Sequence, residues 1–510
     1  MQELLTAAQM RALEQAAIDS GAVSGLELME RAGQGVVAAI FAQWPDLAGV
    51  PARAVVLCGP GNNGGDGFVV ARLLSGWGWE VAVYLAANPE NLPPDARANY
   101  QRWCEIGAVQ GFPEGGLAPQ PGALIVDALF GTGLTRPVAA PLLGALRDNS
   151  ARVVAVDLPS GLCSDSGKVL GTAAVRADLT VTFDSAKLGH VLGQGPELCG
   201  KLVIKDIGLG MRPGAIAPVR PNPPAKLLDQ DRLGNLAKPN GHKFAHGHAL
   251  ILSGGAARSG AARLAARGAL RIGAGLVTLG VPGSAQMEVA AQITAIMLRR
   301  VDDAEALTAV LEDRRITALC LGPGLGIDRA GPLIAAALNA ASAPAVVLDA
   351  DALSAIAQER ALFRHLTARC VLTPHAGEFA RLFPDIAARL TQVPDSGPAF
   401  SKVDATRAAA ARAGCVVLFK GADTVIAAPD GRCAVNSAAY ARAVPWLATA
   451  GAGDVLAGFV AGLLARGWDP FRAACDAAWL HVGCAKAFGP GLIAEDLPEV
   501  LPQVLREVIG

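Results

Sequence analysis

The stretch AVVLCGPGNNGGDGF, residues 54 to 68, determines the fold class of the first half of the chain. Its first five residues are apolar, so they predict a buried strand. We expect a glycine-rich loop over residues 59 to 67 and a helix from about Phe68. Glycines let backbone N–H groups approach an anion closely, and the N-terminus of the following helix adds positive charge. The stretch therefore predicts a phosphate or nucleotide cradle in an α/β fold.

A second glycine-rich stretch, TAGAGD at residues 449 to 454, precedes an apolar helix near the other end of the chain. Each stretch carries one carboxylate, Asp66 in the first and Asp454 in the second. An aspartate among anion-binding amides is poorly suited to holding phosphate and well suited to contacting a ribose, a metal or a reacting hydroxyl. The chain is therefore predicted to contain two nucleotide-handling modules with different chemistries.

The composition limits the partners of the protein. A length of 510 residues allows two to four domains, each with its own core. The formal net charge is −1 and 17% of the residues are charged, so we expect no basic surface for nucleic acid. Only 5% of the residues are aromatic, which leaves little material for base stacking.

The N-terminal residues 1 to 12 lack the basic start and apolar core of a signal peptide, so we expect a cytoplasmic protein. The longest apolar run, residues 455 to 465, is shorter than the roughly 20 residues of a membrane span. It therefore predicts a buried helix and no membrane partner. The ten cysteines form no CxxC pair and are expected to be buried small apolar groups rather than metal ligands.

Short apolar runs alternate with helical stretches in both halves, which predicts mostly parallel sheets covered by helices on both faces. The strands predicted in the first half are 54–58, 80–85, 123–126, 152–156, 179–183 and 202–205. Those predicted in the second half are 249–252, 276–279, 318–321, 345–348, 370–372 and 416–419, with helices at 261–271 and 453–466. Residues 211 to 224 hold five prolines and no periodicity, which indicates a stiff extended linker.

The predicted architecture is therefore two three-layer αβα domains without an internal repeat, the first of them Rossmann-like. We place the first domain at residues 1–215, a proline-rich linker at 216–225, and the second domain at 226–510.

Three loops of the first half follow predicted strands, where ligands bind in doubly wound sheets. They supply the oxygen-bearing side chains Asn63, Asp127 and Ser160, which together with backbone carbonyls suit a hard monovalent cation. The glycine spacing matches neither a GxGxxG fingerprint nor a P-loop. The alternative is structural: Asp127 and Asp157 could be helix N-caps, and residues 62 and 63 could form a turn.

Four segments of the first half, in order, carry a resemblance: GPGNNGGDG, DALFGTG, DLPSG and TFDSAKLG…CGKLVIKDIGL. Over residues 1 to 215 they resemble the NAD(P)H-hydrate epimerase family, whose activity is inversion at C6 of the hydrated nicotinamide ring. The resemblance implies that potassium binds at Asn63, Asp127 and Ser160, and that Asp157 contacts the substrate and shuttles the proton. It also implies substrate contacts at Asn62, Asn63, Gly64, Gly65, Asp66, Gly131, Thr132, Gly133, Leu134, Thr135, Arg136 and Pro137.

In the second half, GAGD at a helix start places backbone amides around a transferring phosphoryl group, and Asp454 could take the proton of an acceptor hydroxyl. The run CVVLFKGADT ends a predicted strand in Lys420 and would lie along nucleotide phosphates. The alternatives are a solvated lysine at a strand end and an ordinary carboxylate at a helix N-terminus.

GAGD and KGADT resemble the ribokinase-like superfamily. KPNGHKFAHGHALILSGG, SGAARLAARGALRIGAGLVTL, GPGLG, DADAL and LTPHAGEF resemble its ADP-dependent NAD(P)H-hydrate dehydratase branch. The match covers residues 226 to about 490. It implies hydrate contacts at Ala261, Gly324, His375 and Asp454, and adenine-nucleotide contacts at Lys420, Gly421, Ala422, Asp423, Thr424 and Gly453.

The chemistry implied for this branch is phosphorylation of the 6-hydroxyl, after which phosphate leaves with help from the ring nitrogen. Mg²⁺ with ADP as co-substrate is expected, with Glu378 as an outer-shell ligand. His375 could instead be a buried histidine bonded to backbone, and Trp446 is expected in the core.

The leading hypothesis is a bifunctional repair enzyme for hydrated NAD(P)H that forms a homo-oligomer. One rival is a vitamin-precursor or sugar kinase with an accessory domain, and another is a nucleotide-sensing N-terminal module without catalysis. Sequence alone does not decide the number of subunits, ADP against ATP, NADH-hydrate against NADPH-hydrate, or transfer of substrate between the sites.

Overall fold

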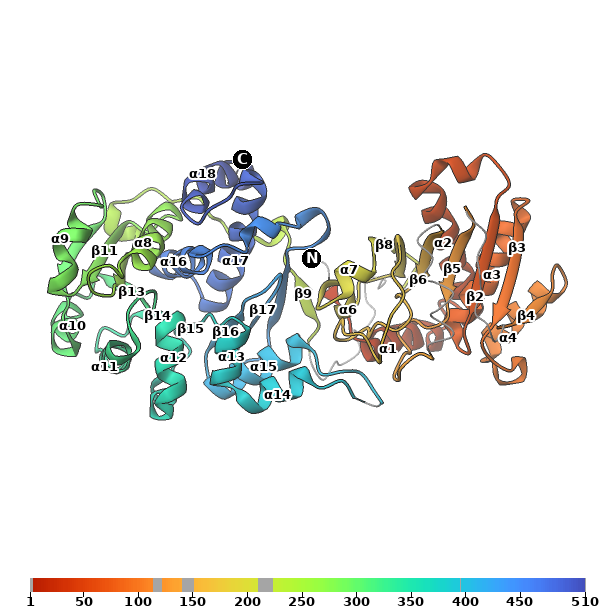
Figure 1. Ribbon diagram of the computed structural model, residues 1–510, viewed down its shortest axis with the longest axis horizontal. Coiled ribbons are helices and arrows are strands. Elements are labelled where there is room, and N and C mark those ends of the chain that lie inside the picture. The colour runs from red at the N-terminus through yellow and green to blue at the C-terminus, as the bar shows by residue number, and fades with distance from the viewer. Residues whose placement is uncertain (1–2, 113–121, 140–150, 210–222, 395, 510) are drawn as a thin grey trace. The chain divides into compact units, whose positions relative to one another are not determined.

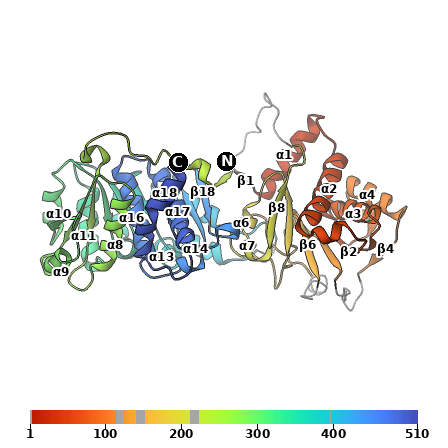
Figure 2. The same ribbon diagram turned by 90° about the horizontal axis from the view of Figure 1, so that it is seen from above.

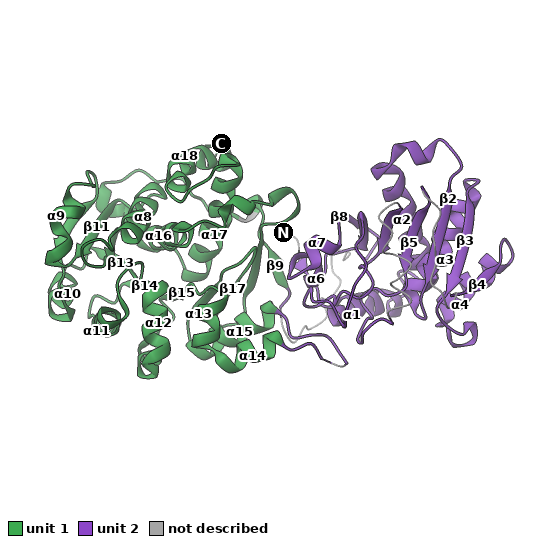
Figure 3. Cartoon of the chain, viewed as in Figure 1, with its two compact units in different colours: residues 1, 225–391, 402–510 green, residues 2–224, 392–401 purple. Residues whose placement is uncertain are grey.

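The computed structural model describes residues 3–112, 122–139, 151–209, 223–394 and 396–509 (Figure 1). The chain divides into two compact units (Figure 3). Residues 2–224 and 392–401 form the first, called the N-terminal unit here, and residues 225–391 and 402–510 belong to the second, the C-terminal unit. Most of the linker predicted at 216–225 lies outside the described residues.

The N-terminal unit is built on a fully parallel seven-stranded sheet with the order β4-β3-β2-β5-β6-β7-β8. Its strands are β2 (Arg53–Cys58), β3 (Glu80–Leu85), β4 (Val109–Gly111), β5 (Leu124–Ala128), β6 (Arg152–Val156), β7 (Leu179–Phe183) and β8 (Lys201–Lys205). This is the strand order of a Rossmann-like sheet, and its direction of winding reverses between β2 and β5. The doubly wound fold predicted for the first half is confirmed, and loops that follow β2, β5 and β6 meet at one edge.

Helices α2, α3 and α4 pack against one another over one face of this sheet. Buried side chains such as Ile40, Val69 and Val126 fill the layer between helices and strands. The helices of the unit are α1 (Ala7–Asp19), α2 (Gly25–Gln43), α3 (Asn62–Gly76), α4 (Pro94–Cys104), α6 (Leu188–Val191) and α7 (Gly195–Leu198), with 3-10 turns at Pro45–Ala48 and Pro89–Asn91 and a short strand β1 (Glu3–Leu4).

The predicted loop over residues 59 to 67 is wrong in its second part, because α3 already begins at Asn62. Its glycines serve close packing rather than loop formation. A Cβ added at Gly67 would lie 2.7 Å from Cβ of Ala128, and one at Gly65 would lie 2.5 Å from Sδ of Met29. The glycine-rich motif therefore forms the first turns of a helix pressed between the sheet and its neighbours, and residues 62 to 66 lie at the N-terminus of α3.

The C-terminal unit has a larger mixed sheet with the order β9-β18-β17-β16-β15-β14-β13-β10-β11-β12. The strands are β9 (Ala225–Leu227), β10 (His248–Leu252), β11 (Leu276–Val281), β12 (Met297–Arg300), β13 (Ile316–Leu321), β14 (Ala345–Leu348), β15 (Cys370–Leu372), β16 (Val416–Phe419), β17 (Asp423–Ala427) and β18 (Cys433–Ser437). From β12 to β16 neighbouring strands are parallel, and β17 runs antiparallel to both of its neighbours. The direction in which successive strands are added to the sheet reverses between β10 and β13.

Helices cover both faces of this sheet. Figure 1 shows α8, α16, α17 and α18 on one side and α11 to α15 on the other, and Figure 2 turns the first group toward the viewer. The helices are α8 (Gly260–Arg271), α9 (Gln286–Ala290), α10 (Ala304–Val310), α11 (Ile327–Leu338), α12 (Ala350–Gln358), α13 (Ala376–Leu382), α14 (Pro384–Thr391), α15 (Lys402–Ala413), α16 (Ala452–Ala465), α17 (Pro470–Phe488) and α18 (Asp496–Ile509). Short 3-10 helices cover Gln230–Arg232, Lys243–His246, Gly283–Ala285, Arg360–His365, Tyr440–Arg442 and Pro445–Leu447.

The apolar run 455–465 lies in α16, which is buried in the core of the C-terminal unit, as predicted. Within the described residues, every helix is too short or too polar to cross a bilayer. All ten cysteines are described, and none of them forms a disulfide. Nine are buried as predicted, but Cys104 at the end of α4 is exposed, which corrects the expectation for that residue.

Candidate active sites

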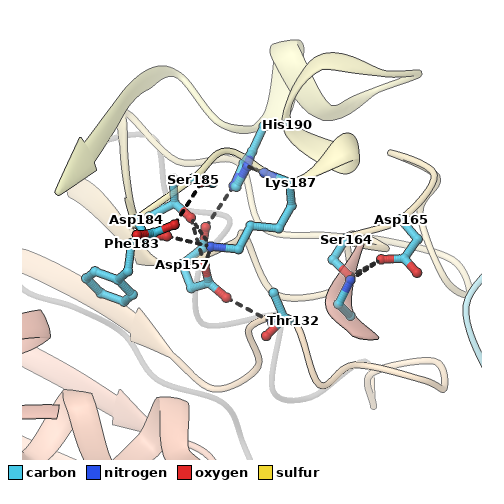
Figure 4. Close-up of polar contacts among 11 residues, drawn as sticks. Thr132, Asp157, Ser164, Asp165, Phe183, Asp184, Ser185, Lys187 and His190 are labelled. Atoms are coloured by element: carbon cyan, nitrogen blue, oxygen red, sulfur yellow. Dashed lines mark hydrogen bonds and ion pairs between the residues drawn. The ribbon is translucent and has the colours of Figure 1, made fainter. Parts of the chain in front are cut away.

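The first site is built around Asp157, which directly follows β6 in a left-handed backbone conformation with φ of 65°. Its carboxylate is fixed from two sides (Figure 4). Oδ1 accepts a 2.8 Å hydrogen bond from the Thr182 hydroxyl and lies 3.0 Å from Nζ of Lys187. Oδ2 accepts a 3.0 Å hydrogen bond from the backbone N–H of Thr132. The interpretation of Asp157 as a helix N-cap is therefore wrong, because the aspartate is a buried partner of a cation.

Lys187 is a residue of this site that sequence reasoning did not identify. Its side chain is only 1% exposed, and it also donates to the hydroxyl of Thr182 at 2.8 Å and to the carbonyl of Phe183 at 3.1 Å. Burial raises the pKa of Asp157 and the ion pair with Lys187 lowers it, with a net downward direction. Asp157 is therefore ionised at neutral pH. The only sequence feature that could have identified Lys187 is its position inside the TFDSAKLG segment.

His190 braces the backbone around this pair. Its Nδ1 accepts a 2.9 Å hydrogen bond from the N–H of Lys187, so the ring proton sits on Nε2, which lies 2.8 Å from the carbonyl of Asp157. Burial, and then the charge of Lys187, lower the pKa of His190 to about 4. The histidine is therefore neutral at pH 7 and holds the strained residue in place through two backbone groups.

Two further carboxylates influence Asp157. Burial, followed by the charges of Asp157 and Glu14, raises the pKa of Asp66 well above its ordinary value. Burial, followed by the charge of Asp157, raises the pKa of Glu14 on α1 to about 7. One lysine cannot neutralise three neighbouring carboxylates, so protons are retained near an ionised aspartate. A protonated acid and an ionised base whose charges influence each other are what a reversible protonation reaction needs.

Gly131 shows how Asn63 joins this group. A Cβ added at Gly131 would lie 2.8 Å from Oδ1 of Asn63 and 2.9 Å from Oδ2 of Asp157. The two oxygens therefore flank the same point of the loop after β5. The amide nitrogen of Asn63 is buried and has no hydrogen-bond partner among the described residues.

Two of the predicted potassium ligands lie together. Oδ1 of Asp127 accepts a 2.6 Å hydrogen bond from the hydroxyl of Ser160, and Oδ2 accepts one of 2.8 Å from the Ser160 N–H. The Ser160 hydroxyl also accepts from the N–H of Phe130 at 3.0 Å. Burial raises the pKa of Asp127 to about 6, against the opposing effect of these hydrogen bonds. Asp127 lies inside β5, so the N-cap interpretation is wrong for it as well.

The remaining substrate residues predicted in this unit differ in exposure. Gly64, Gly65 and Leu134 are buried, Gly133 is exposed, and Thr135, Arg136 and Pro137 are exposed beyond it. The described contacts connect Thr132, but not Arg136, to the Asp157 carboxylate.

The second site lies at the carboxyl ends of the strands of the C-terminal unit, around Lys420. Its Nζ is 2.7 Å from Oδ1 of Asp349 and 3.9 Å from Oε2 of Glu378. A Cβ added at Gly453 would lie 3.4 Å from the same nitrogen, so the ammonium group also faces the first turn of α16. Burial lowers the pKa of Lys420 and Asp349 raises it, with a net upward direction. The alternative of a solvated lysine at a strand end is therefore wrong.

Asp349 was not singled out from the sequence, although it begins the DADAL segment. It directly follows β14, is buried, and accepts a 2.8 Å hydrogen bond from the hydroxyl of Thr373. Burial, and then the charge of Asp349, raise the pKa of Asp454 to about 6. Asp454 is thus a half-buried carboxylate at the N-terminus of α16 with a pKa close to neutral, which suits a general base.

His375 is an exposed helix cap, and the buried alternative is wrong. It is the N-cap of α13, and its side chain is 57% exposed. Nδ1 accepts a 3.0 Å hydrogen bond from the backbone N–H of Gly377. The backbone N–H of His375 donates a 2.9 Å hydrogen bond to the carboxylate of Glu378. Nε2 of His375 lies 3.5 Å from the buried carboxylate of Glu378, so the cap holds Glu378 beside Lys420.

The KGADT segment forms a braced turn between β16 and β17. Nζ of Lys402 donates to the carbonyl of Lys420 at 3.2 Å and to Asp423 at 2.7 Å. The hydroxyl of Thr424 bonds to the N–H and the carbonyl of Gly421. Ala422 is exposed between them. The turn therefore holds its backbone rigidly at the edge of the sheet, as a nucleotide cradle requires.

Ala261 and Gly324 are neighbours, as the prediction requires. A Cβ added at Gly324, which has φ of 64°, would lie 3.6 Å from Cβ of Ala261. Trp446 is 53% exposed, so the expectation that it packs in the core is wrong.

Two family models and several known proteins match this chain. The family model described as YjeF-related protein N-terminus matches residues 25–189, and the model described as NAD(P)H-hydrate dehydratase matches residues 249–505. A protein of Moorella thermoacetica named bifunctional NAD(P)H-hydrate repair enzyme is 36% identical, over 99% of this chain and 97% of its own length. This chain belongs to the family of bifunctional NAD(P)H-hydrate repair enzymes.

Other relatives resemble single halves of this repair-family chain. A Rhodobacter capsulatus protein named NAD(P)H-hydrate epimerase is 48% identical and covers 41% of this chain and 100% of its own length. The structure of a Bacillus subtilis ADP/ATP-dependent NAD(P)H-hydrate dehydratase, co-crystallised with ATP and Mg²⁺, is 26% identical with a TM-score of 0.45, covering 56% of this chain and 99% of its own. The C-terminal unit matches the dehydratase family model and has the αβα architecture predicted for it. The match to a bifunctional repair enzyme covers 99% of this chain, which does not fit the rival hypothesis of a vitamin-precursor or sugar kinase with an accessory domain.

Proposed function

We propose that this protein repairs hydrated NAD(P)H in two steps. The N-terminal unit interconverts the R and S epimers at C6, and the C-terminal unit converts the S epimer to NAD(P)H while ADP gives AMP and phosphate. The observation that carries the proposal is the match of the whole chain, rather than one half, to bifunctional repair enzymes. Two acid–base groups support it, Asp157 directly after β6 and Asp454 at the N-terminus of α16.

In the first step we assign Asp157 the role of base and counter-ion. The hydroxyl at C6 leaves as water when an acid protonates it, and the ring nitrogen lone pair stabilises the resulting cation. Asp66, whose raised pKa favours the protonated form, is suited to give that proton. Water then adds to either face of the ring, and the ionised Asp157 accepts its proton. Lys187 keeps that carboxylate ionised until the ring cation forms.

In the second step we assign Asp454 the role of base toward the 6-hydroxyl. The hydroxyl oxygen attacks the β-phosphoryl group of ADP, AMP leaves, and the new phosphate departs as the ring nitrogen donates its electron pair. Lys420 and the N-terminal amides of α16 stabilise the negative charge on the moving group. Residues 420 to 424 and Gly453 would hold the nucleotide, and Ala261, Gly324 and His375 would contact the hydrate.

Potassium fits part of the first site. Asp127 and Ser160 provide a buried donor set made only of oxygens with one carboxylate, which suits a monovalent cation, whereas Asn63 is placed beside Asp157. Potassium would supply a fixed positive charge near the loop after β5. A higher melting temperature in KCl than in NaCl, absent in Asp127→Asn, would support this assignment. Equal melting temperatures in the two salts would refute it.

Mg²⁺ would arrive with the nucleotide and neutralise its phosphates. Asp349 and Glu378 both pair with Lys420, so they are suited to contact the water shell of such an ion rather than the ion itself.

We also propose that the chain forms a homo-oligomer, because Phe488 and Ile493 leave large apolar side chains exposed on the C-terminal unit. Light scattering measures the mass directly. We keep domain limits of 1–215 and 226–510 as a proposal; the division into units near residue 224 supports the first boundary, whereas residues 392–401 group with the N-terminal unit.

The proposal is tested with purified R and S hydrates of NADH and the full-length protein. We expect S hydrate to recover the near-ultraviolet absorbance of NADH only when ADP is present, and R hydrate to do so after epimerisation. Without ADP, each pure epimer should give a mixture of both. Formation of a stable phosphorylated product would instead show a kinase, and the function proposed here would be wrong.

A further inference from the structure

The C-terminal unit contains a cavity of about 900 Å³ along the outer face of α8. The opposite face of this helix is buried against α16, so the cavity is separate from the core. Its other walls are the segment 292–296 and helix α18. Ligand sites commonly have volumes of about 300 to 1,000 Å³, so this one is large enough for half of a dinucleotide.

One end of the cavity adjoins the proposed dehydration site. Gly260, which lines the cavity, directly precedes Ala261, the neighbour of Gly324. Leu264, also in the lining, would lie 2.8 Å from a Cβ added at Gly451, the N-cap of α16. The cavity therefore begins where the hydrate and the GAGD loop are expected to meet.

A row of arginines runs from this end along the cavity. Arg263, Arg267 and Arg271 are four residues apart and share one face of α8. Arg267 and Arg271 both pair with Glu499 of α18. Arg263 donates a 3.2 Å hydrogen bond to the side chain of Gln292 and forms no ion pair with any described residue. The arginine nearest the site is thus a half-buried cation that influences Glu288 without pairing with it, and it can still take an anionic partner.

The remaining lining is mixed: polar side chains of Gln292, Thr294, Glu495 and Glu499 lie beside an apolar wall. Leu264, Ile293 and Leu505 come from three different segments and also pack against the core of the unit. A wall of this kind accepts the face of a planar ring, whereas the arginines accept phosphate oxygens. The pair of features matches a molecule with a phosphate group at one end and an aromatic base at the other.

We propose that this cavity binds the adenosine half of the hydrated dinucleotide during dehydration. Arg263 contacts the pyrophosphate next to the reacting end and the adenine lies on the apolar wall. Arg271, at the far end of the row, exchanges its ion pair with Glu499 for the extra phosphate of the NADPH form. Helix α8 has 12 residues and is therefore about 18 Å long, comparable to an extended dinucleotide. The inference rests on the proposed function, and ADP keeps its separate place at residues 420 to 424.

The test compares two substrates in one variant. Hydrated NADH has the adenosine half, and hydrated reduced nicotinamide mononucleotide lacks it. For Arg263→Ala we expect KM for hydrated NADH to rise about tenfold with kcat unchanged, which is the signature of lost uniform binding. The rise in KM should be smaller with the mononucleotide, which keeps only one of the two phosphates, and an unchanged kcat with it also shows that the variant is folded. Arg314→Ala, an exposed arginine outside the cavity, serves as the matched control.

A second variant tests the far end. Arg271→Ala should raise KM for hydrated NADPH more than KM for hydrated NADH. Equal losses on dinucleotide and mononucleotide, or no loss on either, would overturn the proposed subsite. So would a changed subunit number in light scattering, because the cavity would then be an interface between copies. Failure of the unaltered protein to convert any hydrate with ADP would instead overturn the proposed function itself.

Discussion

Replacement of Lys187 by methionine tests the physical basis of the first site. Lys187 and Asp157 form a buried pair at 3.0 Å, so the variant leaves a carboxylate in the interior without its cation. Breaking such a pair costs about 3 to 5 kcal/mol when the remaining group stays charged. The cost falls when that group takes up a proton instead. We therefore expect the pKa of Asp157 to rise above its ordinary value in Lys187→Met.

The sign of the pH dependence follows from this shift. In the unaltered protein the pKa of Asp157 is lowered, so its contribution to stability is present above the unfolded pKa and is lost only in acid. In the variant the folded pKa is raised, and stability falls as pH rises. The loss of stability should be about 3 kcal/mol at pH values near 7 to 8 and about 1 kcal/mol at about pH 4.5.

Hydrogen exchange measured by mass spectrometry on peptides of β6 and β7 reports this loss in the full-length protein, because it separates the two units by sequence. Epimerisation should fall at neutral pH, since a protonated Asp157 cannot accept a proton. Lys201→Met changes an exposed lysine of the same unit and should stay within about 0.5 kcal/mol. An equal loss at both pH values, or unchanged epimerisation, would refute the reasoning.

Three further predictions concern single positions. Asp454→Asn should lower kcat of dehydration at least about 100-fold and leave epimerisation unchanged. In the unaltered protein, the dehydration rate should decline below about pH 6 because Asp454 becomes protonated. NADH absorbance measures the dehydration rate in both experiments. Gly131→Ala should reduce epimerisation and cost about 1 to 3 kcal/mol, because its methyl group would meet two site oxygens; an unchanged rate and unfolding midpoint would contradict this. Asp349→Asn should raise KM for ADP, because Lys420 loses the carboxylate that holds it in position. Isothermal titration measures the affinity for ADP, and an unaltered affinity would contradict the prediction.

The sequence predicted the strands well where they are buried and apolar. The runs 152–156, 345–348, 370–372 and 416–419 form strands with those bounds, because side chains buried on both faces leave nearly continuous apolar segments. The antiparallel strand β17 was missed, since DTVIA begins with polar residues of a nucleotide motif. Helix α3 starts earlier than predicted, because its glycines, which are typical of loops, are required inside the helix by tertiary packing.

The site was predictable in its strand-end aspartates and not in the residues that hold them. Asp157 and Asp127 close strands of a parallel sheet, which already places them at the ligand edge. Lys187 lies after a later strand, and only the folded chain brings it back to Asp157. Asp349 is likewise joined to Lys420 by sheet order rather than by sequence distance.

The central claim is that one chain holds two independent sites that act in sequence on the same substrate. The most direct measurement mixes the variants Asp157→Asn and Asp454→Asn with pure R hydrate and ADP. Each variant alone should recover NADH no faster than the substrate epimerises without enzyme, and an equal mixture should restore rapid recovery, because each supplies the step the other lacks. Rapid recovery by either variant alone, or none by the mixture, would contradict the account.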